Sequence, residues 1–256
     1  MSYLELTAEN IDDEHICCAF SDKKCVESYN LKKDWLRGEF KNGYRFYRLD
    51  ERAKVFIEYG PSESAWVPIK AENLFNINYF WVSGKYKKSG YGKALLARVE
   101  AEAQEEGRDG LVTVSGKQKF HFMSDGKWFL RNGFEIVDET DSGFILLAKS
   151  LSGKYQSPEF PEAVKLGACP DKDGLVVYYS NRCPYAEYHV NNSLIQTSEK
   201  YNLPLKVFKL TSLEQARNAP SPATIFSLFK DGKFITTDLS ICMENRFSKV
   251  FGGEKQ

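Results

Sequence analysis

The sequence predicts an α/β (α+β) fold in two units, residues 1–150 and residues 173–256, joined by a linker over 151–172. The chain has 256 residues, which is more than a domain of average size contains. Up to residue 150, short alternating runs typical of strands surround segments with helical spacing. Proline and glycine then interrupt the pattern until a strand–helix–strand pattern begins at Leu175.

The composition excludes several classes of protein. Hydrophobic residues make up 42% of the chain and aromatic residues 14%, which indicates a folded protein. Lys plus Arg and Asp plus Glu both number 35, so the net charge gives no reason to expect nucleic acid as a partner. No run of about 20 apolar residues predicts a membrane span, and Met1–Asn10 lacks the pattern of a signal peptide. We therefore expect a cytoplasmic protein with no membrane partner.

The first unit alternates short strands with a few helices. Strands are expected where aromatic and β-branched residues gather, and helices where apolar residues recur every three or four positions. The expected elements are, in order, a strand over 3–6, a helix over 25–40, strands over 44–49, 53–59 and 74–82, a helix over 93–106, a strand over 111–114, a helical turn over 127–131 and strands over 134–137 and 144–149.

The second unit begins with a βαβ pattern. A strand over 175–179 is followed by a helix over 185–201 and a strand over 205–210. A short helix over 213–217, a hairpin of strands 223–229 and 233–236 around Asp231-Gly232, and a closing helix over 240–251 complete it.

The turn between the strand at 74–82 and the helix at 93–106 is the first candidate binding site, because it carries three glycines, Gly84, Gly90 and Gly92. Glycine lets the backbone come close to a ligand, and the first amides of a helix have no partner within the helix. Those amides and the positive end of the helix dipole favour a phosphate group. The lysines of the turn, which add positive charge, are Lys85, Lys87, Lys88 and Lys93. A solvated, lysine-rich loop is the alternative interpretation.

This turn resembles the signature of the GNAT superfamily of N-acetyltransferases, in which a strand is followed by Gln or Arg, two residues, Gly, one residue, and Gly or Ala at a helix start. Lys87 stands at the Gln/Arg position, and Gly90 and Gly92 at the small positions. A second segment, Trp128–Phe134, resembles the superfamily's aromatic helical turn that ends in Gly-Phe. The resemblance implies a GNAT fold with a mixed, mainly antiparallel central sheet, and acetyl-CoA as cosubstrate.

The same resemblance implies which residues bind acetyl-CoA. In the superfamily, amides of the turn hold the pyrophosphate, and the fourth strand pairs with the pantetheine arm where it splays from the fifth. The residues so implied are Trp81 and Val82 for the arm, and Lys87, Lys88, Ser89, Gly90, Tyr91, Gly92 and Lys93 for the phosphates.

The acid and base of the reaction are less well marked. Many superfamily members carry a Tyr four residues before the glycine of the second motif, where it protonates the departing thiolate, but this chain has Phe129. An attacking amine must lose its proton, so a carboxylate is expected near the thioester. Glu58 is the candidate catalytic base, and Glu63 in the following loop is an alternative that could meet the substrate. Either carboxylate could equally be a solvated surface group.

The six cysteines, at positions 17, 18, 25, 169, 183 and 242, show no Cys-x-x-Cys pair and no zinc-ligand spacing, so we expect no metal. Cys17 and Cys18 are expected to be small buried residues of a short helix. Cys183 differs, because it stands beside Arg182 at the predicted start of a helix, where a thiol's pKa is lowered. We therefore expect Cys183 to be the reactive thiol, alkylated before the other cysteines.

The segment around Cys183 resembles the active-site turn of thioredoxin-like proteins, with Ala186 in place of the second cysteine. Ser221–Thr224 resembles the cis-proline segment of that fold, which faces the cysteine. Dithiol exchange within the turn would need a second thiol, so a one-thiol role and a binding or dimerisation module stay open. Taken together, the two halves resemble the YoaP-like acetyltransferases, and the resemblance covers most of the chain.

The leading hypothesis is an N-acetyltransferase that moves an acetyl group from acetyl-CoA to a primary amine of a small molecule or peptide. The alternative is a CoA-binding regulatory or thiol-dependent protein without transferase activity. Phe129 favours the alternative and the intact glycine turn favours the enzyme. The residues decide neither the acceptor nor whether the protein forms a homodimer.

Overall fold

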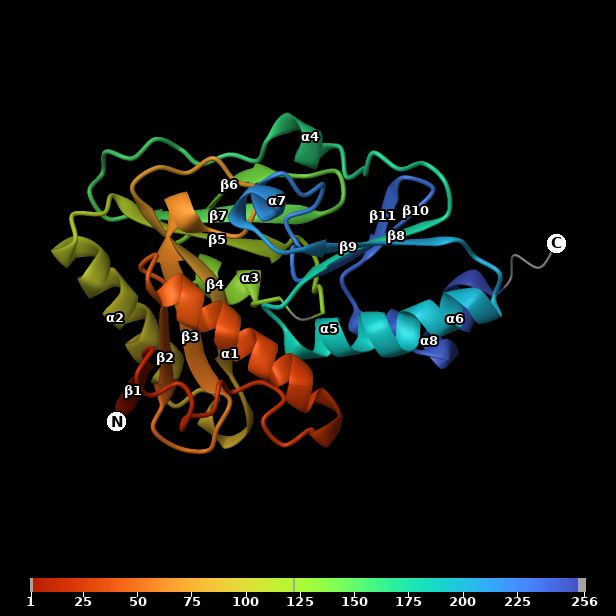
Figure 1. Cartoon of the computed structure of the whole chain (residues 1–256). Helices are drawn as coiled ribbons and strands as arrows, with labels where there is room; N and C mark the ends of the chain where they lie inside the picture. The colour runs from red at the N-terminus through yellow and green to blue at the C-terminus, as the bar shows by residue number, and fades with distance from the viewer. Residues whose placement is uncertain (1, 122, 253–256) are drawn as a thin grey trace.

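The computed structural model describes residues 2–121 and 123–252, whose strands form two sheets. The first sheet has seven strands in the order β1-β2-β3-β4-β5-β7-β6, and the second has four in the order β11-β10-β8-β9. The two sheets lie side by side, each with its own helices (Figure 1). We refer to them and their helices as the first and second units.

The first sheet is mixed and mainly antiparallel, as predicted. Every neighbouring pair is antiparallel except β4 and β5, which run parallel. Parallel strands need a crossover, and the helix α2 supplies it. The strands are β1 (Tyr3–Leu6), β2 (Arg45–Leu49), β3 (Val55–Pro61), β4 (Leu74–Val82), β5 (Gly110–Gly116), β6 (Glu135–Glu139) and β7 (Phe144–Ser150).

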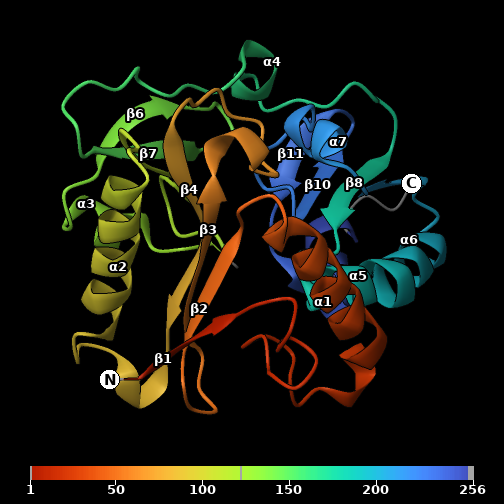
Figure 2. The same ribbon diagram turned by 60° about the vertical axis from the view of Figure 1, so that its left-hand side comes forward.

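Two long helices cover opposite faces of this sheet, α1 (Val26–Phe40) on one and α2 (Tyr91–Glu105) on the other (Figure 2). The predicted stripe of α2, Leu95, Leu96, Val99 and Ala103, is buried against the sheet. A short helix, α3 (Gly126–Leu130), follows β5 and adds Phe129 to the same core. The α1 face contacts the second unit through α5.

The prediction of a short helix around Cys17 and Cys18 is wrong. The chain from Thr7 to Asp22 is a series of turns and bends, followed by the 3₁₀ helix η1 (Lys23–Cys25). Cys17 has φ 60° and Ala19 has φ 53°, both in the left-handed region. A right-handed helix cannot contain such residues, so this segment lies across the end of the sheet as an irregular loop.

The second unit contains the predicted βαβ pattern, with β8 (Leu175–Ser180) and β9 (Leu205–Leu210) parallel. The single helix predicted over 185–201 is continuous but changes its pitch, because a π-helical segment separates two α-helical ones. Helices α5, α6 and α8 cover one face of the sheet in Figure 1. The remaining elements are α5 (Pro184–His189), η4 (Val190–Leu194), α6 (Ile195–Lys200), α7 (Leu213–Arg217), β10 (Phe226–Lys230), β11 (Lys233–Thr236), η5 (Leu239–Cys242) and α8 (Glu244–Phe251).

The segment 151–172 packs between the units rather than hanging free. Phe160 is fully buried, and Glu159 forms a β-bridge with Lys70 of the first unit. The short helix α4 (Glu162–Lys165) contributes Val164 to an apolar cluster that also contains Ile69 and, from the second unit, Ala223. The two units therefore share apolar contacts along this segment.

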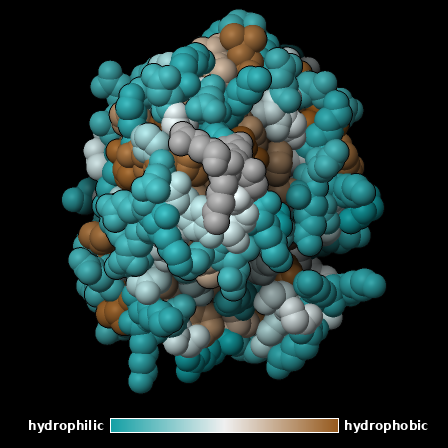
Figure 3. Space-filling model, turned by 90° about the vertical axis from the view of Figure 1, so that its right-hand side faces the viewer, coloured by the Kyte–Doolittle hydropathy of each residue, from teal (hydrophilic) through white to brown (hydrophobic). Residues whose placement is uncertain are grey.

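The outer face of the second unit is largely hydrophilic. In Figure 3 this face turns toward the viewer, and brown, apolar residues form small separate groups among teal ones. Within residues 2–121 and 123–252, no helix combines the length and the apolar character that crossing a bilayer requires.

The first turn of α2 provides a test of the packing. A Cβ placed on Gly92 would lie 2.9 Å from Cζ of Phe80 and 3.2 Å from the Trp128 ring. Those two rings are 4.4 Å apart at their centroids, so neither has room to move aside. We expect Gly92→Ala to lower the free energy of unfolding by about 1–3 kcal/mol in urea titrations.

Gly38 on α1 is the matched control, because a Cβ there meets nothing within 4 Å. Gly38→Ala should raise the free energy of unfolding by up to about 1 kcal/mol through lower chain entropy. Equal effects at both positions would contradict the close approach of α2 to Phe80. An acidic residue at Gly92 would meet the same two rings and is therefore expected to disturb the fold as well.

Candidate functional site

The parallel strands β4 and β5 part in the middle of the sheet. They pair only from Leu74 to Ile77 of β4. Against β3, Glu58 faces Tyr79 while Tyr59 faces Ile77, so Asn78 is an extra residue in β4. A bulge of this kind bends a strand and increases its twist. Beyond Asn78, β4 no longer pairs with β5, and the edge that faced β5 is available to another group.

In this structure the available edge of β4 is met by a hydroxyl. The amide of Phe80 donates to Oγ of Ser124 at 3.2 Å, and the same hydroxyl donates to the Phe80 carbonyl at 3.3 Å. Trp81 beside it is 45% exposed, whereas Val82 packs against the core. A ligand that pairs with this edge must replace Ser124.

The turn after β4 leads straight into the N-terminus of α2. A 3₁₀ turn, η3 (Gly84–Tyr86), is followed by Lys88 and Gly90, which both have positive φ. The first bond of the helix runs from the Ala94 amide to the Gly90 carbonyl. The preceding amides therefore have no partner four residues back, which is the arrangement that binds phosphate groups. The exposed residues at this end are Lys85, Lys87, Lys88, Ser89, Gly90 and Lys93.

The residue at the usual tyrosine position is part of the core. Phe129 is 0% exposed and lies between the rings of Phe80, Trp128 and Phe134. Its ring fills space that α2 and β4 enclose. At this position the segment resembles the GNAT aromatic turn only in how its ring packs. The Phe129 side chain has no acidic proton to donate.

Glu58 is on β3 as predicted, but it is 0% exposed and both of its oxygens are bonded. Lys32 Nζ donates to Oε1 at 2.7 Å, and the Tyr44 hydroxyl donates to Oε2 at 2.7 Å. Burial alone lowers the pKa of Lys32, but the Glu58 carboxylate and the thiols of Cys18 and Cys183 outweigh it, so that the pKa of Lys32 is raised and its ammonium stays charged. The Lys32 ammonium also lies 5.0 Å from the ring centroid of Tyr79.

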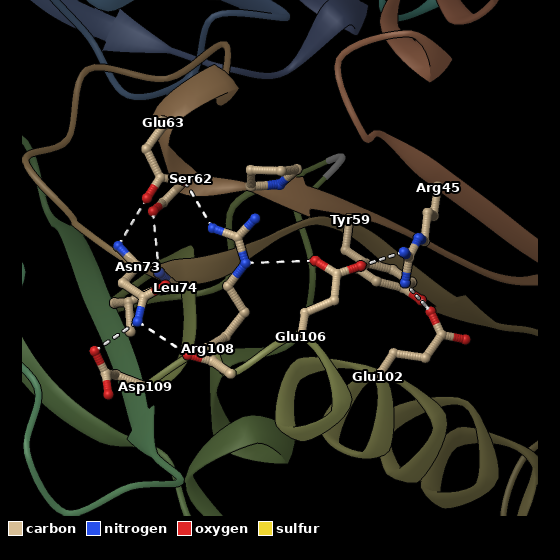
Figure 4. Close-up of polar contacts among 12 residues, drawn as sticks. Arg45, Tyr59, Ser62, Glu63, Asn73, Leu74, Glu102, Glu106, Arg108 and Asp109 are labelled. Carbon is tan, nitrogen blue, oxygen red and sulfur yellow. Dashed lines mark hydrogen bonds and ion pairs between the residues drawn. The ribbon is translucent and has the colours of Figure 1, made fainter.

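Glu63, the alternative carboxylate, lies at the far end of α2. It accepts from the amide of Asn73 at 2.7 Å and from Arg108 at 3.1 Å, and Arg108 also pairs with Glu106, the residue that follows α2 (Figure 4). A 15-residue helix is about 22 Å long, so Glu63 is remote from the amides at the start of α2. It is part of a structural network and does not meet the donor site.

A pocket of about 50 Å³ lies where β4 leaves β5, and both units form its walls. The first unit contributes Asn76, Asn78 and Tyr79, and the second contributes Arg182 and Thr224. Among the residues that the structure describes, Oδ1 of Asn76, the hydroxyl of Tyr79 and Nε of Arg182 are buried without a hydrogen-bond partner. Burial raises the pKa of Tyr79 well above its ordinary value, so its hydroxyl stays protonated.

Arg182 joins the two units at this pocket. The residue is 4% exposed, and Nη1 donates to the Trp66 carbonyl at 2.9 Å and to Thr224 Oγ1 at 2.8 Å. Nη2 donates to Oδ1 of Asn78, the bulged residue of β4, at 2.7 Å. Arg182 of the second unit therefore binds β4 at Asn78, the residue where β4 turns away from β5.

The structure does not favour Cys183 as the most reactive thiol. Cys183 precedes α5, but it is only 6% exposed. Interaction with the nearby Cys18 thiol, together with burial, raises the pKa of Cys183 well above its ordinary value. The same interaction lowers the pKa of Cys18 to about 7. The low-pKa thiol is thus a residue to which the sequence assigned no chemistry.

The resemblance to a cis-proline segment also needs correction, because the Ser221–Pro222 peptide is trans. The segment still lies at the pocket, where Pro222 and Thr224 form part of the wall. Sequence reasoning missed three further residues, Asn78, Ser124 and Arg182. Arg182 was weighed only as a charge beside Cys183, and nothing in the spacing of Asn78 or Ser124 marks a bulge or an edge contact.

Comparison with known proteins adds the following. Residues 204–249 match the family described as YoaP-like. The chain is 42% identical over 250 residues to the uncharacterized N-acetyltransferase YoaP of Bacillus subtilis (strain 168), covering 98% of both chains. The PaiA N-acetyltransferase of Thermoplasma acidophilum in complex with coenzyme A is 17% identical with a TM-score of 0.41, over 59% of this chain and 100% of that one. A GNAT-family acetyltransferase of Staphylococcus aureus Mu50 is 13% identical with a TM-score of 0.39, over 59% and 99%.

The likeness to the Bacillus subtilis protein spans both units and every segment that forms the pocket. The match at residues 204–249 lies within the second unit, from β9 to α8. On this ground the chain belongs to the family of YoaP-like N-acetyltransferases.

Proposed function

We propose that this chain transfers an acetyl group from acetyl-CoA to a primary amine. The observation that carries the proposal is the parting of β4 from β5 at Asn78, which is followed, after the end of β4 and a short turn, by the open amides of α2. A pyrophosphate needs such amides, and an arm that contains peptide groups can pair with an open strand edge. The two features are continuous through residues 83–90, so one extended donor can meet both.

The donor residues follow from this geometry and from the GNAT resemblance. The arm runs along β4 past Trp81 and Val82, and replaces Ser124 at Phe80. The pyrophosphate lies on the turn and the first turn of α2, and exposed lysines neutralise part of its charge. The residues proposed for the phosphates are Lys87, Lys88, Ser89, Gly90, Tyr91, Gly92 and Lys93.

The acceptor amine lies in the pocket between the units. Oδ1 of Asn76 is an unpaired acceptor there, and a group with N–H bonds would satisfy it. Residues of the second unit form part of the wall, so we propose that this unit helps to choose among small molecules and peptides. The thiolate leaves without the usual tyrosine, because Phe129 carries no proton to give.

Glu58 is the proton acceptor we propose. Because its carboxylate has no exposed surface and neither Glu58 nor Tyr44 lines the pocket, we propose that the proton of the amine reaches it through a relay that ends at the Tyr44 hydroxyl bonded to Oε2. The competing role for Glu58 is structural, as the counter-ion of buried Lys32. Removing one partner of a buried ion pair destabilises a protein strongly, so the two roles need separate readouts.

The second unit, from residue 173 onward after the connecting segment 151–172, is proposed to be a thioredoxin-like domain. The parallel pair β8 and β9, the antiparallel neighbours β10 and β11 and the closing helix α8 support this assignment. The alternative function, CoA binding without transfer, is supported by Phe129 alone.

Gly90 gives a matched test of the donor site. It has φ 82°, a conformation that Asn and Asp both tolerate better than other residues, and a Cβ there meets nothing within 4 Å. We expect Gly90→Asp to raise the dissociation constant of acetyl-CoA at least about tenfold in calorimetry, because a carboxylate would face the pyrophosphate. Gly90→Asn should change it by less than about threefold. Equal affinities for the two variants would remove the phosphates from this turn.

Release of free CoA in the presence of polyamines, amino acids, aminoglycosides and peptides tests the transfer itself. We expect release that depends on one class of amine, and a kcat at least about tenfold lower for Glu58→Gln with acetyl-CoA affinity unchanged. The control is Glu58→Gln combined with Lys32→Met, which removes the unpaired buried charge.

If Glu58 is only a counter-ion, this double variant should regain both stability and kcat. If it accepts the proton, stability should return and kcat should stay low. Absence of amine-dependent release across the whole panel would favour CoA binding without transfer.

A further inference from the structure

A pair of cysteines lies at the junction of the two units, away from the donor turn. Cys18 comes from the irregular loop before α1, and Cys183 stands between β8 and α5. The two thiols are close enough for each to shift the pKa of the other. Helices α1 and α5, which follow the two cysteines, contact each other, and α5 also contacts the 3₁₀ helix η1. The chain segments that carry the two cysteines therefore lie against each other, as a disulfide between them requires.

The two thiols differ in access. Cys18 is partly exposed, whereas Cys183 is 6% exposed. The other four cysteines, Cys17, Cys25, Cys169 and Cys242, are at most 1% exposed. A reagent from solution therefore reaches Cys18 more readily than Cys183.

The surroundings favour negative charge on Cys18. The nearby Cys183 thiol stabilises that charge, and the ammonium groups of Lys32 and Lys54 act in the same direction. Burial and the carboxylate of Glu58 act against it. The balance lowers the pKa of Cys18 to about 7, so a large part of Cys18 is thiolate at neutral pH. Cys183 keeps its proton, as the resolving member of a dithiol pair does before the first exchange step.

We propose that Cys18 and Cys183 form a thiol–disulfide exchange site between the two units, with small-molecule disulfides as oxidant. In the first step the Cys18 thiolate attacks one sulfur of the disulfide R–S–S–R, forms the mixed disulfide Cys18–S–S–R and releases one thiolate. In the second step Cys183 gives its proton to that thiolate and attacks Sγ of Cys18, which expels the second R–S group as a thiolate that takes a proton from water. One molecule of disulfide becomes two of thiol, and the two cysteines become one disulfide.

This site supplies the second thiol that the turn around Cys183 lacks. Ala186 stands where a resolving cysteine would be in the turn, and the partner comes instead from the first unit. The disulfide ties that loop to the residue next to Arg182, which holds the bulge of β4 through Asn78. The oxidised protein thus has its two units covalently closed over the pocket.

The test is a reaction of the reduced full chain with hydroxyethyl disulfide, stopped with acid and followed by alkylation and peptide mass spectrometry. We expect the Cys18 and Cys183 thiols to disappear together and a peptide pair joined by Cys18–Cys183 to form, while the other four cysteines stay alkylatable. Dithiothreitol should restore both thiols. A lasting mixed disulfide on Cys18, or a bond from Cys18 to its neighbour Cys17, would overturn the proposal.

Variants separate the two roles. Cys183→Ser should trap the mixed disulfide on Cys18, and Cys18→Ser should abolish reaction with hydroxyethyl disulfide. Cys17→Ser is the matched control, because burial raises the pKa of Cys17 to about 12 and its loss should leave the exchange unchanged. If Cys18→Ser still consumes the disulfide at the wild-type rate, Cys18 is not the attacking group. The wild-type peptide map decides the pairing even where a variant fails to fold.

Discussion

The relative position of the two units depends on the hydrogen bonds made by the buried guanidinium of Arg182. A charged group taken out of water needs hydrogen-bond partners, and the Nη1 and Nη2 atoms of Arg182 donate to neutral oxygens on both units, while its Nε has no partner. The same network includes Thr224, whose hydroxyl donates to the Trp66 carbonyl at 2.5 Å. Separating the units would break the hydrogen bonds that run between them. These bonds therefore keep the second unit in place as a wall of the pocket.

The bulge at Asn78 links this network to the donor site. Because the extra residue turns β4 away from β5, the sheet opens just where Arg182 binds Asn78. The parting of the strands gives an edge, the helix α2 gives amides, and the second unit closes the remaining side. Chemistry at such a site would take place among residues drawn from both halves of the chain.

Much of this architecture could be predicted because local patterns are strong. The stripe Leu95, Leu96, Val99 and Ala103 marks the buried face of α2, and the alternating strands and the Asp231-Gly232 hairpin follow their sequence signals. The site was harder to predict. Glu58 and Phe129 occupy their predicted elements, yet their chemistry is decided by neighbours such as Lys32 and Phe80 that lie far away in the sequence.

The cysteines show the same limit. A helix start lowers a thiol's pKa in isolation, which is why Cys183 looked reactive. Interaction with Cys18 reverses the order, because it raises the pKa of Cys183 and lowers the pKa of Cys18. In the loop that contains Cys18, Cys17 and Ala19 have left-handed backbone conformations. No periodicity in the sequence predicts such conformations.

A crystal structure of the full chain with acetyl-CoA bound would test most directly whether both units share one transferase site. We expect the pyrophosphate on the amides at the start of α2 and the arm along β4 in place of Ser124. The acetyl group should face Arg182, and Arg182 should keep its bond to Asn78. An acetyl group bound away from the second unit, or a complex in which Arg182 has left Asn78, would contradict a shared site.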